Sequence, residues 1–354
     1  MKRDEFTQVL QEHMTRYPLM EPQDFGKLIY QGEFGPEHLI QSPEQVLGYI
    51  RAERSLLPAP AETKEAEWIG NRMCRFPLEN LKDAGDEELL AKLFYLTARE
   101  CTGTEKGLSA KMDRLDGWGN EGLSRWLSDY RAKGCPPVGH SEAFRKAYRP
   151  HYRLLKEEYA SYFPVLSAVW HLLSEKEAAV ISIDGRCGSG KTMLSELLAR
   201  VFICNVFHID DFYLPLAQRV SDWTERPCAN MDLDRFLREA VLPAKEGKTV
   251  TYRPYSCQRG EYLPAMMMPH RPLTVVEGSY SQHPSLAGSY DMNIFLTCRK
   301  DEQRRRLEAR EGEYFSVFEN RWIPLEEGYL SRYAIEEKAT IQVDTSAFFL
   351  HETE

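Results

Sequence analysis

The sequence contains no long hydrophobic run. None of its apolar stretches approaches the ~18 residues that a membrane-spanning helix needs. The first residues, MKRDEFTQVLQEHM, lack the apolar centre of a secretory signal peptide. We therefore expect a cytoplasmic protein that has no membrane partner.

Closely spaced cysteines are also missing. The eight cysteines are scattered along the chain, without a CxxC motif and without a paired Cys/His spacing. Structural zinc sites usually contain at least one close pair of ligands, so zinc binding is the minor alternative. Free thiols in a reducing compartment explain these cysteines best.

The chain has no excess of positive charge. Its 45 Lys and Arg residues stand against 54 Asp and Glu residues, which gives a net charge of −9. Because proteins that bind nucleic acid electrostatically usually show the opposite balance, we expect no nucleic-acid partner. The hydrophobic fraction of 42% is enough for a sizeable core. The 354 residues suit two domains at roughly 100–200 residues each.

The pattern of apolar residues changes near residue 175. Before that point they recur every three or four positions, which predicts helices, and strand-like alternation is scarce. Residues 140–177 are expected to continue as helix, with interruptions near Pro150 and Pro164. We therefore predict a mostly α-helical accessory domain over residues 1–173 and a second domain over residues 174–354.

The second domain is predicted to be α/β. Five short runs rich in β-branched residues alternate with helical patterns, at residues 178–184, 205–210, 273–278, 292–298 and 340–346. Apolar strands separated by helices are typical of a parallel sheet covered on both faces. The expected fold is therefore a doubly wound parallel sheet.

A phosphate-binding motif follows the first expected strand. GRCGSGKT fits G-x-x-x-x-G-K-[ST] without exception and opens an amphipathic helix. Its glycines let backbone N–H groups turn toward phosphate oxygens, and the helix points the positive end of its dipole at the same place. The predicted nucleotide-binding residues are Gly185, Arg186, Cys187, Gly188, Ser189, Gly190, Lys191 and Thr192.

Three residues of this loop carry separate expectations. Lys191 is expected to reach the β- and γ-phosphates of the nucleotide, and Thr192 to offer its hydroxyl group to Mg²⁺. Cys187 could make nucleotide binding sensitive to oxidation, but an ordinary variable position is the simpler interpretation.

Carboxylates follow several expected strands, where the ligands of open α/β sheets gather. Asp210 and Asp211 come after the strand NVFHI, and the alternative for them is a helix cap or a turn. Glu277 ends the strand LTVVE and is expected to hold Mg²⁺ directly or through water. Asp184 stands just before the phosphate loop, and its side chain could serve only to accept hydrogen bonds from loop amides.

An arginine-rich helix is expected at RKDEQRRRLEAR. Arg306 and Arg310 are four residues apart and share a helical face, so their two guanidinium groups could close on one phosphate chain. The alternative is a solvated helix whose arginines pair with neighbouring acids.

The segments SIDGRCGSGKT, HIDDFY, VVEGSYSQHPSL and RKDEQRRRLEAR, in this order and spacing, resemble the uridine-kinase and phosphoribulokinase branch of the P-loop kinases. The resemblance covers only the C-terminal half of the chain. It implies a P-loop kinase fold that uses ATP and Mg²⁺, with Asp210 as the base for an acceptor hydroxyl. Asp211 is then its neighbour, with a metal or substrate role.

The resemblance extends to NMDLDRFLREAVLPAKEGKTVTYRPYS, which is similar to the acceptor segment of uridine kinases. It implies that Asp232 binds sugar hydroxyls and that Arg253 or Tyr255 lines the acceptor pocket, with Tyr213 of the DDFY motif on the same side. Met231 stands where the family has an aromatic residue. No base-recognising residue is therefore assigned.

Two functions follow as hypotheses. The first is ATP-dependent phosphoryl transfer to a hydroxyl group of a small molecule, with a nucleoside as the favoured acceptor and pantothenate or a sugar phosphate as alternatives. The second is a nucleotide-dependent regulatory switch or ATPase that couples the P-loop domain to partner binding by the helical domain. A GTPase version is disfavoured because no Asn-Lys-x-Asp motif occurs. A homo-oligomer or a protein partner bound through the helical domain stays open.

Overall fold

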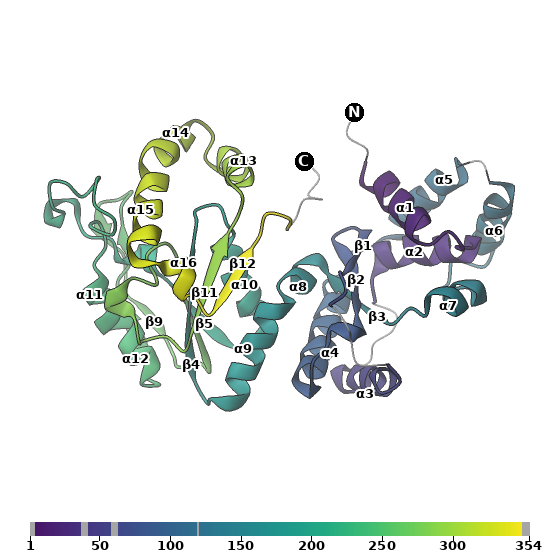
Figure 1. Ribbon diagram of the computed structural model, residues 1–354, viewed down its shortest axis with the longest axis horizontal. Coiled ribbons are helices and arrows are strands. Elements are labelled where there is room, and N and C mark those ends of the chain that lie inside the picture. Colours follow the sequence, from purple (N-terminus) through teal and green to yellow (C-terminus); the bar gives the residue numbers. More distant parts are fainter. Residues whose placement is uncertain (1–3, 37–41, 58–62, 119, 349–354) are drawn as a thin grey trace. The chain divides into compact units, whose positions relative to one another are not determined.

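The computed structural model describes residues 4–36, 42–57, 63–118 and 120–348 (Figure 1). Two compact units divide the chain: one contains the described residues up to Ser167, and the other spans Ala168–Phe348. This division falls inside helix α9 (Phe163–Glu175). The boundary expected from composition, between residues 173 and 174, lies within the same helix.

Helices form most of the first unit. They are α1 (Glu5–Arg16), α2 (Pro22–Phe34), α3 (Pro43–Arg54), α4 (Ala84–Arg99), α5 (Glu105–Asp116), α6 (Glu121–Ala132), α7 (Glu142–Tyr148) and α8 (Glu157–Ser161). Several begin at a polar residue whose side chain accepts a hydrogen bond from the first turn, which satisfies a backbone N–H that has no partner within the helix. Ser42 does so for α3, Asp83 for α4 and Ser141 for α7.

A small antiparallel sheet in the first unit corrects the prediction for residues 152–156. Strands β1 (Glu67–Gly70), β2 (Met73–Pro77) and β3 (Tyr152–Lys156) pair in the order β1-β2-β3. Leu155 of β3 lies opposite Cys74 of β2. The prediction of continuous helix there is wrong, because a partner strand distant in sequence decides the conformation and local periodicity does not report that partner.

The second unit contains the predicted parallel sheet. Its strands are β4 (Ala179–Gly185), β5 (Cys204–His208), β10 (Leu273–Glu277), β11 (Met292–Thr297) and β12 (Ile341–Asp344). They lie in the order β12-β11-β4-β10-β5, and every neighbouring pair is parallel. All five strands expected from the β-branched runs are confirmed, and helices flank the sheet (Figure 1).

The other elements of the second unit are short. They are α10 (Lys191–Val201), α11 (Leu233–Phe236), α12 (Leu242–Lys245), α13 (Lys300–Glu311), α14 (Phe315–Val317), α15 (Ile323–Tyr333), α16 (Ile335–Lys338) and the hairpin strands β6 (Val250–Tyr252), β7 (Tyr255–Ser256), β8 (Glu261–Tyr262) and β9 (Met266–Met268). Among the described residues, no helix combines the length and the apolar character that crossing a membrane requires.

Strand register brings the ends of three strands together. Glu277, the last residue of β10, lies opposite Ile183 of β4 on one side and opposite His208 of β5 on the other. Because the strands are parallel, their carboxyl ends meet at one edge of the sheet. The phosphate loop, Glu277 and the segment that follows His208 therefore share that edge.

Candidate functional site

The loop of residues 185–190 has the backbone of an anion-binding nest. Gly188 and Gly190 have φ angles of +75° and +96°, a region that side chains other than that of glycine rarely adopt. Gly185 passes so close to β11 that an added Cβ would lie 2.0 Å from the Leu296 carbonyl oxygen. The residue before α10 is Gly190, which has no side chain that could cap the helix. The first N–H groups of α10 are therefore available to another acceptor.

The Lys191 side chain folds back over this loop. Its Nζ donates to the carbonyl oxygens of Gly185, at 2.6 Å, and of Arg186, at 3.2 Å. The ammonium group thus places a positive charge beside the backbone of the loop. Thr192, next along α10, is exposed.

A carboxylate from α15 already interacts with the loop. Glu326 is only 3% exposed and accepts hydrogen bonds from the Cys187 backbone N–H, at 2.7 Å, and from the Ser279 hydroxyl, at 2.6 Å. Glu326 also lies 3.9 Å from Lys191 Nζ. The loop thus donates one backbone hydrogen bond to an anionic group supplied by the chain itself. Sequence reasoning missed Glu326, because it lies far downstream in a helix without any motif.

Asp184, buried below the loop, has the structural role that was one of its two alternatives. Its carboxylate accepts hydrogen bonds from the backbone N–H groups of Gly185 and Gln282 and from the Tyr329 hydroxyl. Burial raises the pKa of Asp184 to about 6, and these hydrogen bonds oppose the shift. Asp184 therefore ties the start of the loop to the segment after β10.

Asp210 lies at the same edge, in a short 3-10 turn (Ile209–Phe212) directly after β5. Its Oδ1 accepts a hydrogen bond from the Tyr213 hydroxyl, at 3.0 Å. The side chain is accessible, yet the surrounding protein displaces much of its hydration, and this desolvation raises the pKa of Asp210. The negative charge of Glu277 adds to the increase in pKa, whereas the charges of Lys191 and His208 oppose it. These influences place all four groups in one electrostatic cluster.

Glu277 and His208 form a pair within that cluster. His208 Nδ1 lies 2.5 Å from Glu277 Oε1, and this hydrogen bond raises the pKa of His208. Glu277 is buried and His208 is partly exposed. Sequence reasoning missed His208, although its place as the last residue of a strand at this edge is a usable signal. The carboxylates of Glu277 and Asp210 and the Thr192 hydroxyl are oxygen ligands of the type that Mg²⁺ prefers.

Arg235, a buried residue of α11, organises three residues assigned to the acceptor side. Its guanidinium group donates to the backbone carbonyls of Arg253, at 2.9 Å, and of Asp211, at 3.3 Å. Asp232 caps α11 by accepting a hydrogen bond from the Arg235 backbone N–H. The guanidinium also lies 4.4 Å from the centre of the Phe212 ring. The structure therefore brings Asp211, Asp232 and Arg253 together around an arginine that sequence reasoning missed.

Most of the predicted acceptor side chains also have partners within the protein. The Asp211 carboxylate accepts a hydrogen bond from the Tyr252 hydroxyl, at 2.8 Å. Arg253 donates to the carbonyl oxygens of Tyr262 and Leu263, at 2.9 Å each. Tyr255 is buried, with its ring edge-on to the Tyr262 ring. These contacts hold the three side chains in place within the second unit.

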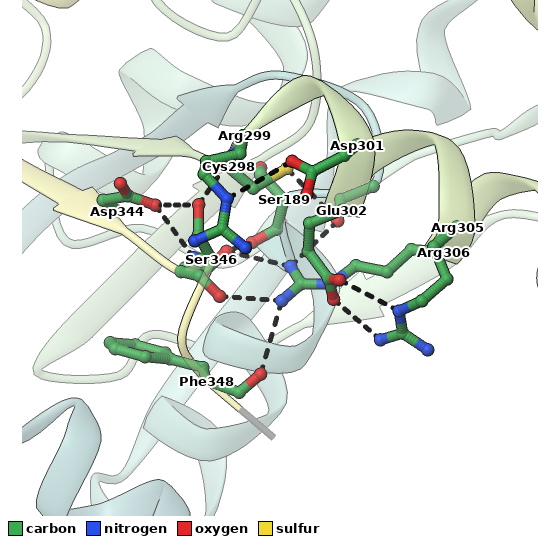
Figure 2. Close-up of polar contacts among 12 residues, drawn as sticks. Ser189, Cys298, Arg299, Asp301, Glu302, Arg305, Arg306, Asp344, Ser346 and Phe348 are labelled. Atoms are coloured by element: carbon green, nitrogen blue, oxygen red, sulfur yellow. Dashed lines mark hydrogen bonds and ion pairs between the residues drawn. The ribbon is translucent and has the colours of Figure 1, made fainter. Parts of the chain in front are cut away.

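The two arginines expected to close on one phosphate chain have different surroundings. Figure 2 shows the Arg306 guanidinium group beside Glu302. Arg306 donates to Gly188 O, at 3.2 Å, and to Thr345 O, at 2.7 Å, and it pairs with Glu302 at 2.7 Å. It therefore links α13 to the phosphate loop and to the segment after β12. Arg310 is exposed, and its Nε donates to Glu311. The structure does not bring the two guanidinium groups onto one point.

Several solved structures are similar to about half of this chain. No protein-family model matches the chain, and no curated protein matches its sequence. A possible uridine kinase from Bacillus stearothermophilus is 19% identical over 51% of this chain and 100% of that chain, with a TM-score of 0.40. D-glycerate 3-kinase from Cryptococcus neoformans is 15% identical over 50% of this chain and 89% of that chain, with a TM-score of 0.37.

A third solved structure, the YGR205w protein, is 15% identical over 53% of this chain and 94% of that chain, with a TM-score of 0.35. Each of these three similarities covers about half of this chain. At these identities the likeness concerns the fold alone, so the chemistry of the site is derived from its own geometry.

Proposed function

We propose that this chain is an ATP-dependent kinase that transfers a phosphoryl group to a hydroxyl group of a small molecule. The observation that supports it most is the shared sheet edge, which brings the phosphate loop after β4, Glu277 after β10 and Asp210 after β5 into one cluster. A nucleoside is the acceptor that we favour. Pantothenate and sugar phosphates are the alternatives.

The phosphate loop and its lysine would bind the nucleotide. Backbone N–H groups at the start of α10 and the Lys191 ammonium would surround the β- and γ-phosphates. Mg²⁺, when bound, would neutralise charge on these phosphates, and Thr192 and Glu277 would hold it. Arg310 is exposed on α13. Burial raises the pKa of Cys187 in the loop, and the positive charge of Arg310 opposes that increase. It is the arginine available to approach the transferred group.

Asp210 would accept the proton of the acceptor hydroxyl. The Tyr213 hydroxyl group fixes its Oδ1, which leaves Oδ2 for the acceptor. A general base works best when its pKa lies close to the operating pH, and desolvation moves the pKa of Asp210 upward in that direction. The acceptor would lie beside the walls formed by Asp211, Tyr213, Asp232, Arg253 and Tyr255.

The pH profile of transfer provides a test of this base. Asp210 accepts a proton only when it is ionised, so the rate should fall as the pH drops through the pKa of Asp210. Because that pKa is raised, the fall should begin above the pH expected for a carboxyl group with the ordinary pKa of 3.8. The measurement is kcat against pH, with the Asp210→Asn variant as control. If kcat of the Asp210→Asn variant fell over the same pH range and by the same factor, the assignment of Asp210 as the base would be contradicted.

Transfer of labelled γ-phosphate tests the proposed function directly. The purified chain, with ATP and Mg²⁺, would be incubated separately with nucleosides, pantothenate and sugar phosphates, and phosphorylated products would be separated and counted. We expect one acceptor class to be labelled. ATP binding without transfer to any hydroxyl acceptor would contradict kinase activity and would favour the second candidate function.

That second candidate is a nucleotide-dependent switch or ATPase, and the Glu326 contact is the observation that favours it. Glu326 occupies donors of the loop that a nucleotide phosphate would also use. Binding of the nucleotide would then displace this carboxylate and alter the position of α15. A switch of this kind would show a nucleotide-dependent change in α15 without acceptor phosphorylation.

Replacing Glu326 with Gln should strengthen ATP binding by about fivefold to tenfold, since a like charge next to the phosphate site is removed. The amide oxygen of Gln can still accept the hydrogen bond from the Cys187 N–H, so the loop should keep its form. Isothermal titration calorimetry with ATP measures the change. Glu196→Gln, at an exposed position of α10, is the matched control for loss of one charge. Unchanged or weaker ATP binding in Glu326→Gln would show that this carboxylate does not compete with phosphate.

A further inference from the structure

The first unit contains a pocket that the phosphate loop does not explain. Helices α2, α3 and α7 and strand β3 contribute to its lining. Its lining includes the buried apolar residues Val46, Phe94 and Leu154, here called the apolar wall. It also includes the cations Lys27, Arg145 and Arg149, here called the cationic wall.

The acidic groups near this pocket already have partners. Glu53 pairs with His151, at 2.9 Å, and with Arg153, at 2.8 Å. Asp24 accepts hydrogen bonds from the Ser141 hydroxyl, at 2.6 Å, and from the Ser141 backbone N–H, at 3.0 Å. His140 also lies 3.1 Å from Asp24. Both carboxylates therefore have hydrogen-bond or ion-pair partners other than Lys27, Arg145 and Arg149.

Lys27, Arg145 and Arg149 form no ion pair with any residue that the structure describes. The one hydrogen bond of Lys27 Nζ is a long contact of 3.5 Å to the Val138 carbonyl. Burial, together with the positive charges of Arg75 and Arg145, lowers the pKa of Lys27 to about 8. The negative charge of Asp24 opposes this decrease in pKa. In a chain with a net charge of −9, the lining still contains more Lys and Arg residues than Asp and Glu residues.

A buried hydrogen-bond network supports the wall beside Lys27. His140 Nε2 lies 2.7 Å from the Tyr152 hydroxyl, and Gln31 Nε2 donates to that hydroxyl at 3.2 Å. The buried Arg75 donates twice to Gln31 Oε1, at 2.9 and 3.1 Å. Side chains connected in this way are held in place before a ligand arrives, which lowers the entropy that binding must overcome.

We propose that this pocket binds a small molecule that carries a phosphate group beside an apolar or aromatic portion. Three cations match a phosphate dianion better than a single carboxylate charge, and guanidinium groups donate to phosphate oxygens in pairs. The apolar wall of Val46, Phe94 and Leu154 would cover the rest of the molecule. This site is separate in sequence from the phosphate loop, and it does not depend on the proposed kinase activity.

Phenyl phosphate is the probe for this site, because it joins a phosphate group to an apolar ring. Titration calorimetry would use the full-length chain with Lys191→Ala, so that the phosphate loop contributes little to the binding heat. We expect saturable binding that is stronger than that of inorganic phosphate, and none with phenol. Equal affinity for phenyl phosphate and inorganic phosphate would overturn the role of the apolar wall. Equal affinity for phenol would overturn the role of the cations.

Two variants in the same background test the residues. Lys27→Met and the double variant Arg145→Gln/Arg149→Gln should each weaken binding of phenyl phosphate by about tenfold or more, since each removes charge-assisted hydrogen bonds. Lys146→Gln should not change it, because Lys146 is exposed on the same helix, pairs with Glu142 and does not line the pocket.

The thermal stability of Lys27→Met supplies a second readout. Removal of a desolvated cation that lies close to other cations should raise the melting temperature of the protein while phosphate binding is lost. A residue present only for stability would show the reverse. The Arg145→Gln/Arg149→Gln variant tests phosphate binding even if Lys27→Met fails to fold. Both arginines are exposed, so their replacement should leave the fold intact. Unchanged affinity in the double variant would overturn the proposal.

Discussion

Asp210→Asn is expected to lower the rate of phosphoryl transfer by about a hundredfold to ten-thousandfold, the usual contribution of a general base. ATP affinity should stay within about twofold of the unmodified protein, because only the acceptor proton depends on this carboxylate. Asn has the same shape as Asp, and the amide oxygen can still accept the hydrogen bond from the Tyr213 hydroxyl group. The variant therefore removes a charge and a proton acceptor without removing the contact that positions the side chain.

The measurements are kcat for γ-phosphate transfer and the dissociation constant of ATP by calorimetry. Asp222→Asn is the matched control, because Asp222 is an exposed aspartate whose neutralisation loosens only a 3.6 Å pair with Arg226. Transfer at close to the original rate in Asp210→Asn would exclude this residue as the base. A parallel loss of ATP affinity would instead assign Asp210 to metal or nucleotide binding.

Lys191→Ala is expected to impair both nucleotide binding and transfer. An ammonium group that contacts phosphate oxygens makes charge-assisted hydrogen bonds, so its loss should weaken ATP binding by about tenfold or more. Transfer should fall further, by about a hundredfold to a thousandfold, because charge develops on the phosphoryl oxygens during transfer. This outcome would contrast with Glu326→Gln, in which removal of the opposite charge at the same place should strengthen ATP binding.

The comparison of kcat with ATP affinity separates the two roles of Lys191. Lys248→Ala is the matched control, since Lys248 is exposed in the same unit and pairs with Glu246. Thermal unfolding checks that the loop survives the loss of the contacts from Lys191 Nζ to the Gly185 and Arg186 carbonyls. Unchanged ATP affinity in a folded Lys191→Ala protein would contradict the assignment of the loop as the nucleotide site.

Short-range patterns predicted the parts of the second unit that depend on short-range structure. The glycines of GRCGSGKT encode positive φ angles at Gly188 and Gly190, and the β-branched runs encode strands. The position of Glu277 at the end of β10 follows from the length of its run. These features were predictable because each depends mainly on the conformational preferences of adjacent residues.

For the arginine-rich helix α13, the sequence predicted the helix but not the contacts of its arginines. The four-residue spacing of Arg306 and Arg310 was correct as a statement about one helix, because α13 spans both residues. The contacts of Arg306 depend on what packs against that helix, namely the Gly188 and Thr345 carbonyls. A helical pattern states which side chains share a face, but it does not state which groups that face will meet.

The sequence by itself determined the phosphate loop, the five parallel strands and the acids that follow them, because adjacent residues select turns, strands and helix starts. Only the tertiary structure decided that Glu326 contacts the loop, that Arg235 joins the acceptor segments and that β3 pairs with β2. The same holds for the cationic pocket, whose residues come from elements between α2 and β3. The physical reason is that these contacts join groups that are distant along the chain. They stabilise the protein only after folding has brought the groups within hydrogen-bonding or packing distance.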